Sequence, residues 1–399
     1  MSVPLSKEAP RATNSKERIW TKDFFLICIS NFFIFLSFQM TLPTIPLYVE
    51  TLGGSDRLIG FIVGIFAFSA LLIRPYAGHA LDSKGRGFIY ILGLSIFTVT
   101  IGMFGLIPSL VFLFILRIFQ GIGFGFSTTA SGTIATDIIP ASRRGEGMGF
   151  YGLFGNLSLA LGPTLGLTLA GHISFTQLFL ICAGLGLISL LLSLKINYRK
   201  AEKITSPIKK WDLYEKSALP PSILIFFITI TFGGVASFLP IYALEKGIQG
   251  IQWYFLLYAL ALMVTRTFAG RIYDQKGHRA VFPFGTGLIL IAMFLLAWLP
   301  NSFILYLAAV LYGFGFGSIQ PALQAWAVQS AEVNRRGMAN ATFFSSFDLG
   351  VGIGAITFGQ IAYLFNYSSI YIASALSVTI SLVLYFTKFG KIQVQSVNG

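Results

Sequence analysis

The sequence predicts an all-α membrane protein, with twelve transmembrane helices in two pseudo-symmetric six-helix bundles. Apolar residues make up 55% of the 399 residues and charged residues only 11%, whereas soluble domains carry about 25% charged residues. The apolar residues form long continuous runs, which exclude the alternating pattern of a β-barrel. Motifs of the first half of the chain also recur in the second half at a constant spacing.

Each predicted helix rests on an apolar stretch of sufficient length. A helix needs about 20 apolar residues to cross a hydrocarbon core of about 30 Å, and twelve stretches of the sequence meet this requirement. The first six lie at 24–48, 58–78, 88–107, 109–138, 146–170 and 175–196. The other six lie at 221–243, 251–271, 280–299, 302–329, 338–364 and 368–388.

A single long polar loop divides these stretches into two domains. We expect an amino tail at 1–23, a first bundle at 24–196, a linker at 197–220, a second bundle at 221–388 and a carboxyl tail at 389–399. Lys and Arg cluster in both tails, in the linker and in the loops after even-numbered spans. This asymmetry predicts a multi-pass protein of the cell membrane with both termini in the cytoplasm.

The composition also excludes several classes of function. The net charge of +13 does not indicate nucleic-acid binding, because the basic residues lie between apolar spans and form no contiguous patch. No nucleophile constellation, nucleotide fingerprint or metal-binding cluster is visible, so we expect neither an enzyme nor a cofactor. The sequence therefore favours a transporter of small molecules.

An internal repeat supports the two-bundle organisation. Residues 74–87 read RPYAGHALDSKGRG, and residues 266–279, which begin 192 positions later, read RTFAGRIYDQKGHR. At the same offset, the glycines of 121–125 match those of 313–317, and Arg-Arg-Gly at 143–145 matches 335–337. Several features at one offset indicate a duplicated six-helix unit with parallel repeats.

These motifs resemble the major facilitator superfamily over essentially the whole chain, and within it the bacterial twelve-span drug:proton antiporters. The resemblance is carried by Gly78 to Arg86 after span 2, by Arg117 to Gly121 in span 4, and by Gly149 with Gly162-Pro163-Thr164-Leu165-Gly166 in span 5. In the span 5 motif, Ser158 and Leu167 stand where the family usually has glycine. The resemblance implies a monomeric exporter that is driven by the proton gradient.

The resemblance also implies a conformational latch on the cytoplasmic side that holds an outward-open state. Asp82 would lie against the amino end of span 11, which attracts negative charge, and Arg86 would pair with Asp137. The latch residues are Gly78, Asp82, Gly85, Arg86 and Asp137, with Asp274 and Gly277 as the second copy. The alternative is that these basic loops only fix the orientation in the membrane.

Arg117 is a first candidate for proton coupling. It lies about 10 Å into span 4, where a charge normally faces a cavity or a partner. The resemblance places it on the central cavity, where it would couple proton movement to substrate. The alternative is a structural tether to backbone carbonyls or to Gln120.

Asp348 is a second candidate, because it is the only carboxylate near the middle of the membrane. Relatives often keep an acid in span 1, where this sequence has Asn31 and Gln39. The repeat partner of Asp348 is Asn156, so this level is polar in both halves. Asp348 would take a proton from one side and release it to the other, or, alternatively, pack spans 11 and 2 as a neutral acid.

The glycines of the span 5 motif are expected to allow close helix packing. Pro163 would add a kink that shapes the seam between the bundles. The antiporter motif thus comprises Gly149, Gly162, Pro163 and Gly166.

The substrate cavity is expected to be aromatic and weakly polar. Its candidate residues are Asn31, Gln39, Gln120, Asn156, Phe227, Thr231, Tyr258, Tyr312, Gln320 and Phe344. Such a cavity would suit amphipathic molecules, cationic ones included, with Asp348 as the only anion. The leading hypothesis is proton-coupled export, with protons, lipid and a small molecule as partners. The alternatives are uptake or facilitated transport of a small polar solute, and a receptor or scaffold that has lost transport.

Overall fold

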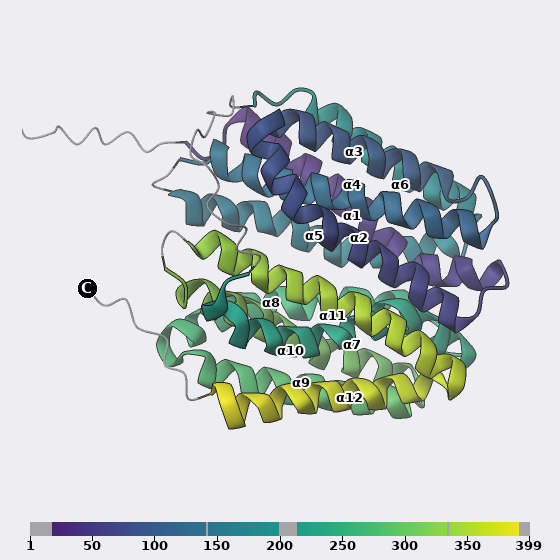
Figure 1. Cartoon of the computed structure of the whole chain (residues 1–399). Helices are drawn as coiled ribbons and strands as arrows, with labels where there is room; N and C mark the ends of the chain where they lie inside the picture. Colours follow the sequence, from purple (N-terminus) through teal and green to yellow (C-terminus); the bar gives the residue numbers. More distant parts are fainter. Residues whose placement is uncertain (1–17, 141–142, 199–213, 333–334, 391–399) are drawn as a thin grey trace, which may run out of the picture.

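The computed structural model describes residues 18–140, 143–198, 214–332 and 335–390, and these residues form twelve long helices (Figure 1). The helices of the first half are α1 (Lys22–Thr51), α2 (Asp56–Lys84), α3 (Arg86–Met103), α4 (Leu110–Ile138), α5 (Arg144–Ala170) and α6 (Phe175–Ser193). Those of the second half are α7 (Leu219–Glu245), α8 (Ile251–Lys276), α9 (His278–Trp298), α10 (Ser302–Gln329), α11 (Arg336–Leu364) and α12 (Tyr367–Leu384). A short helix, η2 (Lys216–Ala218), precedes α7, and a π-helical turn, η4 (Tyr385–Phe389), follows α12.

The twelve predicted spans correspond to these twelve helices, so the predicted all-helical membrane fold is confirmed. Among the described residues, eleven helices are long and apolar enough to cross a membrane. For α8, the apolar segment among the described residues is Ile251–Arg266. Most of the predicted linker and carboxyl tail, and residues 1–17, lie outside the described residues.

The duplication extends to the residues that begin and end the helices. Ser109 and Asn301, 192 positions apart, accept hydrogen bonds at the starts of α4 and α10, from the backbone N–H of Phe112 at 3.4 Å and of Ile304 at 3.1 Å. These caps satisfy N–H groups that have no partner within the helix. Gly85 and Gly277, also 192 positions apart, have φ angles of +94° and +67°, which L side chains rarely adopt. The repeat therefore fixes helix boundaries as well as helix order.

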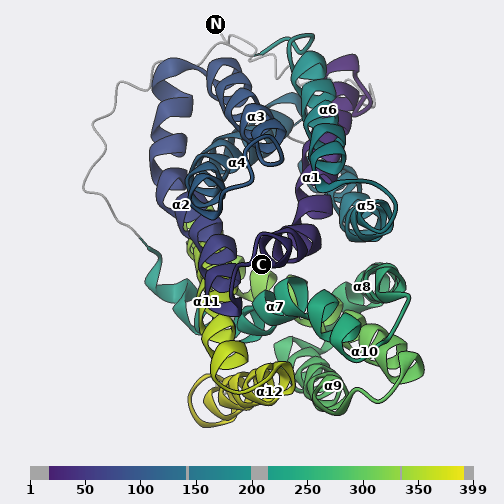
Figure 2. The ribbon, with the colours of Figure 1, turned by 90° about the vertical axis from the view of Figure 1, so that its right-hand side faces the viewer.

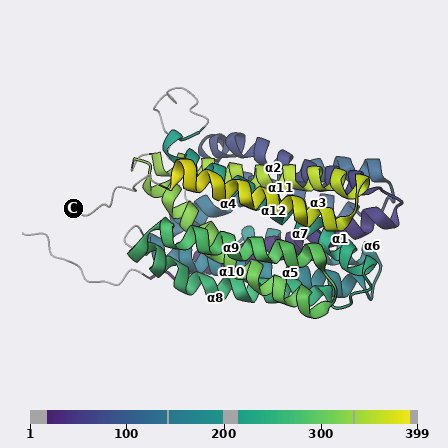
Figure 3. The same cartoon turned by 90° about the horizontal axis from the view of Figure 1, so that it is seen from below.

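The helices are arranged as two bundles of six. Figure 2 shows α1 to α6 on one side and α7 to α12 on the other, and Figure 3 shows that the helix axes lie roughly along one line. The neighbours within each bundle correspond: α1 packs on α5 and α6 as α7 packs on α11 and α12. Between the bundles, the principal contacts are α2 with α11, α5 with α8 and α1 with α7. Because the number of helices is even, residues 18 and 390 lie on the same face, which we call the terminal face.

The bundles interlock in the half of the molecule away from the terminal face, which we call the opposite face. Here the Nε of Arg57 donates to the Oε1 of Gln360 at 3.0 Å, and the hydroxyl of Tyr367 donates to the Oδ1 of Asp56 at 2.6 Å. The α2–α11 backbones approach closely at Gly60, where an added Cβ would lie 2.5 Å from a carbonyl oxygen of α11. The two bundles are therefore closed against each other at the opposite face.

The halves of the helices near the terminal face are more open. Gly149 and Gly152 of α5 are exposed, and a Cβ added at either position would meet no neighbouring atom within 4 Å. Both precede Asn156, which faces α8, by about one or two turns, so they lie close to the same helix face. The structure is therefore a state that opens toward the terminal face.

The end of the linker is attached to α11 at the terminal face. Glu215 forms an ion pair with Arg335, the residue before α11. The backbone N–H of Glu215 also donates to the hydroxyl of Thr342 in α11 at 2.9 Å. The chain therefore enters the second bundle along α11, although α7 is the next helix in sequence.

Glu215→Gln is expected to lower thermal stability at neutral pH by about 1 kcal/mol or less, the usual range for partly exposed ion pairs. The hydrogen bond from Arg335 holds the pKa of Glu215 below its ordinary value of 4.5. Stability from such a group is fully present above the ordinary pKa and is lost as pH falls through the lower pKa of the folded state. Melting temperatures of both proteins should therefore converge as the pH falls from 4.5 through the lower pKa of the folded state. A difference that persists unchanged in acid would contradict this account.

Candidate functional site

An ion pair joins the two bundles in the central part of α2 and α11. The Nη2 of Arg74 in α2 lies 3.0 Å from the Oδ2 of Asp348 in α11, and the two side chains are 27% and 23% exposed. Thr128 of α4 lies 3.5 Å from the Nη1 of the same arginine. Asp348 thus packs α11 against α2, as the alternative interpretation of this residue expected. It does so through an ion pair with Arg74, a charged partner that the sequence analysis did not predict.

A second arginine crosses between the bundles on the other side of the molecule. The Nη1 of Arg266 in α8 donates to the Oδ1 of Asn156 in α5 at 2.5 Å, and its Nη2 donates to the Oε1 of Gln320 in α10 at 2.6 Å. A row of amides continues from Gln320 through Gln324 to Asn340 of α11, at 3.4 Å and 2.9 Å. The predicted cavity residues Asn156 and Gln320 are therefore brought together by an arginine.

The two contacts between the bundles, one at Arg74 and one at Arg266, are related by the 192-residue repeat. Arg74 and Arg266 occupy equivalent positions, and so do Asp348 and Asn156. Each arginine contacts the residue equivalent to the partner of the other, but one contact is an ion pair and the other involves neutral amides. The sequence does contain the signal, since both arginines lie within apolar stretches, where charges mark functional positions.

Arg117 is enclosed within the first bundle. Its Nε donates to the carbonyl of Ile62 at 3.0 Å, its Nη2 to that of Val63 at 3.4 Å, and its Nη1 to the Oε1 of Gln120 at 2.6 Å. The guanidinium lies 4.4 Å from the centre of the Phe66 ring. Arg117 is 2% exposed and Gln120 is fully buried. The expectation that they face the central cavity is wrong in this state, and the contacts match the alternative of a structural tether.

Arg117→Gln is accordingly expected to destabilise the protein before it affects coupling. The shorter amide cannot reach both α2 carbonyls, and each buried polar group left without a partner costs about 1–3 kcal/mol. We expect a lower melting temperature, with the proton-to-substrate ratio of the remaining transport unchanged. A changed ratio at normal stability would instead support the coupling role.

The predicted latch is described only in part. Arg86, in the first turn of α3, pairs with Asp137 near the end of α4, as predicted. Gly85 and Gly277 provide the expected tight turns, and a Cβ at Gly78 would meet nothing within 4 Å. The side chains of Asp82 and Asp274 lie outside the described residues, so their role as a latch stays a prediction.

The glycines of the antiporter motif serve two different contacts. A Cβ added at Gly162 would lie 2.4 Å from the Cβ of Gln39, and one at Gly166 would lie 2.4 Å from the carbonyl oxygen of Met40. Both glycines thus allow α5 to pack closely on α1 within the first bundle. The other two residues of the motif lie at the seam between the bundles instead. Pro163 contacts this seam, and Gly149 faces open space beside it.

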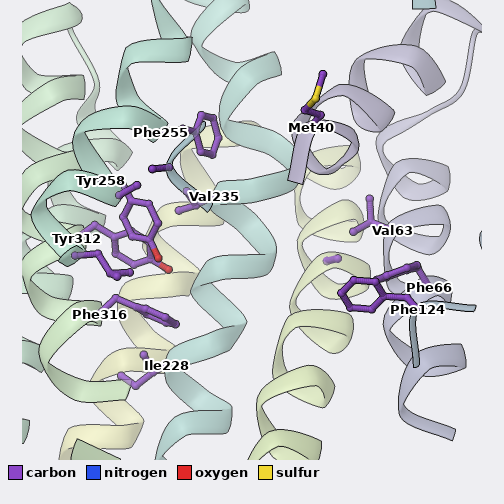
Figure 4. Close-up of a cluster of buried hydrophobic side chains, with 14 of the residues drawn as sticks. Met40, Val63, Phe66, Phe124, Ile228, Val235, Phe255, Tyr258, Tyr312 and Phe316 are labelled. Atoms are coloured by element: carbon purple, nitrogen blue, oxygen red, sulfur yellow. The ribbon is translucent and has the colours of Figure 1, made fainter. Parts of the chain in front are cut away.

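A small, mainly apolar pocket lies between the bundles, on the opposite-face side of the two arginines. Its lining residues are Gln39, Leu42, Leu159, Pro163, Phe232, Val235, Phe255, Tyr258 and Tyr312. Figure 4 shows Tyr258 and Tyr312 side by side, and their ring centroids are 5.3 Å apart. The Oε1 of Gln39 and the hydroxyl of Tyr258 are buried without a hydrogen-bond partner among the described residues. The pocket therefore offers aromatic surface and polar atoms that a bound molecule would satisfy.

Several predicted cavity residues lie elsewhere. Asn31 is 2% exposed, and its Oδ1 accepts from the hydroxyl of Tyr151 at 2.8 Å inside the first bundle. Thr231 is fully buried behind the pocket, with its hydroxyl 2.9 Å from that of Tyr312. The placement of Asn31 and Thr231 in the cavity is therefore wrong in this state, because hydropathy gives the depth of a residue but not the face on which it lies. Phe227 and Phe344 are half-buried and do not line this pocket, so their place in the wider cavity stays a prediction.

Comparison with known proteins identifies the family. The sequence profile of the Major Facilitator Superfamily matches residues 27–252 and 222–395. An MFS-type transporter of Methanocaldococcus jannaschii is 26% identical over 382 residues, which cover 91% of this chain and 97% of the relative. A multi-drug resistance efflux pump PmrA homolog of Lactococcus lactis subsp. lactis is 23% identical, with 93% and 96% covered. The crystal structure of the nucleoside transporter NupG superposes with a TM-score of 0.78 over 91% of this chain and 98% of that one, at 13% identity, and so shares the fold. The chain therefore belongs to the Major Facilitator Superfamily and is a multi-pass membrane transporter of that family.

Proposed function

We propose that this transporter exports small amphipathic molecules in exchange for protons, with Asp348 as the proton carrier. The ion pair between Arg74 and Asp348, which joins the bundles at mid-membrane, carries the proposal. Protonation of Asp348 removes the negative charge that holds α11 against α2. The proton therefore acts on the contact between the bundles, whose relative movement is transport.

The charged pair fits the state seen here. The basic loops support cytoplasmic termini and a location in the cell membrane, so the terminal face would be cytoplasmic. With Asp348 ionised and paired, the empty carrier would be held open to the cytoplasm, ready for a substrate. After outward movement separates the pair, an unpaired carboxylate in the membrane interior is costly, and Asp348 would take up a proton from outside. Return of the protonated carrier and loss of the proton to the cytoplasm would complete the exchange.

The pocket supports an amphipathic substrate, because its lining is mainly apolar and includes four aromatic side chains, while Gln39 and Tyr258 provide polar atoms. Similarity to an efflux pump of Lactococcus lactis supports export. The row of amides beyond Arg266 favours the alternative, uptake of a small polar solute. The direction of proton movement separates these two functions.

The test uses purified protein in liposomes that contain a pH-sensitive dye, with a panel of labelled amphipathic and polar compounds. The expected result is proton movement that depends on substrate and runs opposite to it. Substrate movement without proton movement, or with protons in the same direction, would contradict antiport and favour the alternative.

A further inference from the structure

The cation Arg266 has only neutral partners in the space between the bundles. Its hydrogen bonds go to the amide oxygens of Asn156 and Gln320, and no described carboxylate forms an ion pair with it. By contrast, Arg74, the repeat-related arginine, is paired with Asp348. A charge within a membrane span normally faces a partner or a water-filled cavity. The second bundle thus carries a positive charge without a counterion in this state.

The neighbouring groups are also arranged to receive an anion. Because the guanidinium has only donors, both amides must turn their oxygens toward it. The NH₂ group of Asn156 then faces the surroundings as a further donor, whereas that of Gln320 donates to Gln324 at 3.4 Å. Only two of the five guanidinium N–H groups make the hydrogen bonds to Asn156 and Gln320. The side chains of Arg266, Asn156 and Gln320 are half-buried. A ligand that enters from the terminal face would therefore meet hydrogen-bond donors around a cation.

This cluster is aligned with the apolar pocket. Pro163, which lines the pocket, follows Asn156 on α5 by seven residues, or about 10 Å, and Phe255 precedes Arg266 on α8 by eleven residues, or about 16 Å. Both spacings return to the same helix face at 3.6 residues per turn. An anion-accepting cluster and an aromatic pocket therefore lie along one line, separated by the length of a small amphipathic molecule.

We propose that the site binds amphipathic acids, with the anionic head at Arg266 and the apolar part in the pocket. This inference rests on the proposed transport function and specifies its substrate class. It also reverses the expectation that Asp348 would attract cationic compounds. Asp348 is already neutralised by Arg74, whereas Arg117 is held by carbonyls inside the first bundle. The charge that remains available to a ligand is positive.

The binding test uses the full-length protein in nanodiscs of zwitterionic lipid, at one pH and without a gradient. The probe is ω-phenyloctanoate, compared with ω-phenyloctylamine and ω-phenyloctanol of the same length, with empty nanodiscs as the blank. We expect the acid to bind about tenfold to a hundredfold more tightly than the alcohol, the range for a hydrogen bond to a charged group. A wild-type protein that binds no acid, or binds the amine or alcohol as tightly, overturns the proposal.

Variants assign the preference to Arg266. Arg266→Gln should reduce the affinity for the acid to that for the alcohol, and Arg266→Lys should keep most of the preference. Asn156→Asp should also remove it, because the new carboxylate would neutralise Arg266. Lys246→Gln, an equal loss of charge at the exposed opposite-face end of α7, should change nothing. A preference that survives in Arg266→Gln would overturn the assignment.

Two further comparisons complete the test. Addition of phosphatidylglycerol to the nanodiscs identifies the source of the acid. If this lipid competes with the probe and the competition requires Arg266, the site belongs to an anionic lipid. If binding of the probe is unchanged, the site belongs to a free acid. Since the assay needs no proton gradient, its failure would leave proton antiport standing. Failure of the proton-flux experiment would likewise leave the binding site standing.

Discussion

Asp348→Asn is expected to reduce proton-driven substrate movement to the level of empty liposomes, while substrate still exchanges down its own gradient. The amide cannot carry a proton, so a pH gradient has no group at mid-membrane on which to act. It also leaves Arg74 without its ionic partner. For a pair about one quarter exposed, we expect this to destabilise the observed state by about 1–2 kcal/mol, or roughly tenfold in its population.

Two conservative variants make the result specific. Asp348→Glu keeps an ionisable group and should retain part of the coupling, whereas Glu245→Gln removes an exposed carboxylate at the opposite-face end of α7 and should leave coupling intact. Normal insertion and a monodisperse elution profile would show that Asp348→Asn folds. Proton-driven transport by Asp348→Asn at the wild-type rate would exclude Asp348 as the carrier.

The sequence was sufficient for the features that depend on one helix at a time. The length of each apolar run gave the twelve spans, and the 192-residue repeat gave two bundles whose caps and turns correspond, as Ser109 and Asn301 show. Depth was also predictable, so Asp348 was recognised as a carboxylate at mid-membrane. These properties follow from hydropathy and spacing, which are local.

The direction that a side chain faces and the residue that it contacts were not predictable in the same way. The depth of Arg117 was known, but whether it faced the cavity or α2 depended on the rotation of α4, and the structure directs it toward the Ile62 and Val63 carbonyls. The repeat aligned Arg74 with Arg266, but it could not show that Arg74 would meet Asp348. That contact exists because the bundles place α2 beside α11. The partner of Arg74 lies in the other repeat, whereas the comparison of the two repeats matches only equivalent positions.

Gly60→Val is expected to disfavour the closed opposite face and shift the protein toward the outward-open state. A Cβ at Gly60 would lie 2.5 Å from the carbonyl oxygen of Ala355 and 3.2 Å from the Cα of Gly359. Because these atoms belong to the backbone of α11, no side chain can rotate away. Overpacking of this kind costs about 1–3 kcal/mol, so the state population should change by roughly tenfold to a hundredfold.

Spin labels at Pro108 and Pro300 would measure the shift, because both residues are exposed and occupy equivalent positions at the opposite face of the two bundles. Their separation should lengthen in Gly60→Val. Gly287→Val in α9 is the matched control, since a Cβ there meets nothing within 4 Å. An unchanged distance distribution in a folded Gly60→Val protein would show that the α2–α11 contact does not set the conformation.

Gly149→Val should act in the opposite direction. Gly149 has open space in the present state, but it lies on the α5 face that carries Asn156, where α8 would close in the outward-open state. A valine would therefore cost nothing here and obstruct that closure, so the labels at Pro108 and Pro300 should keep their short separation even with substrate present. Both variants should slow transport, but for opposite reasons. If Gly60→Val and Gly149→Val change the Pro108–Pro300 distance in the same direction, the bundles do not open and close at the two contacts, α2–α11 and α5–α8, in which these glycines lie.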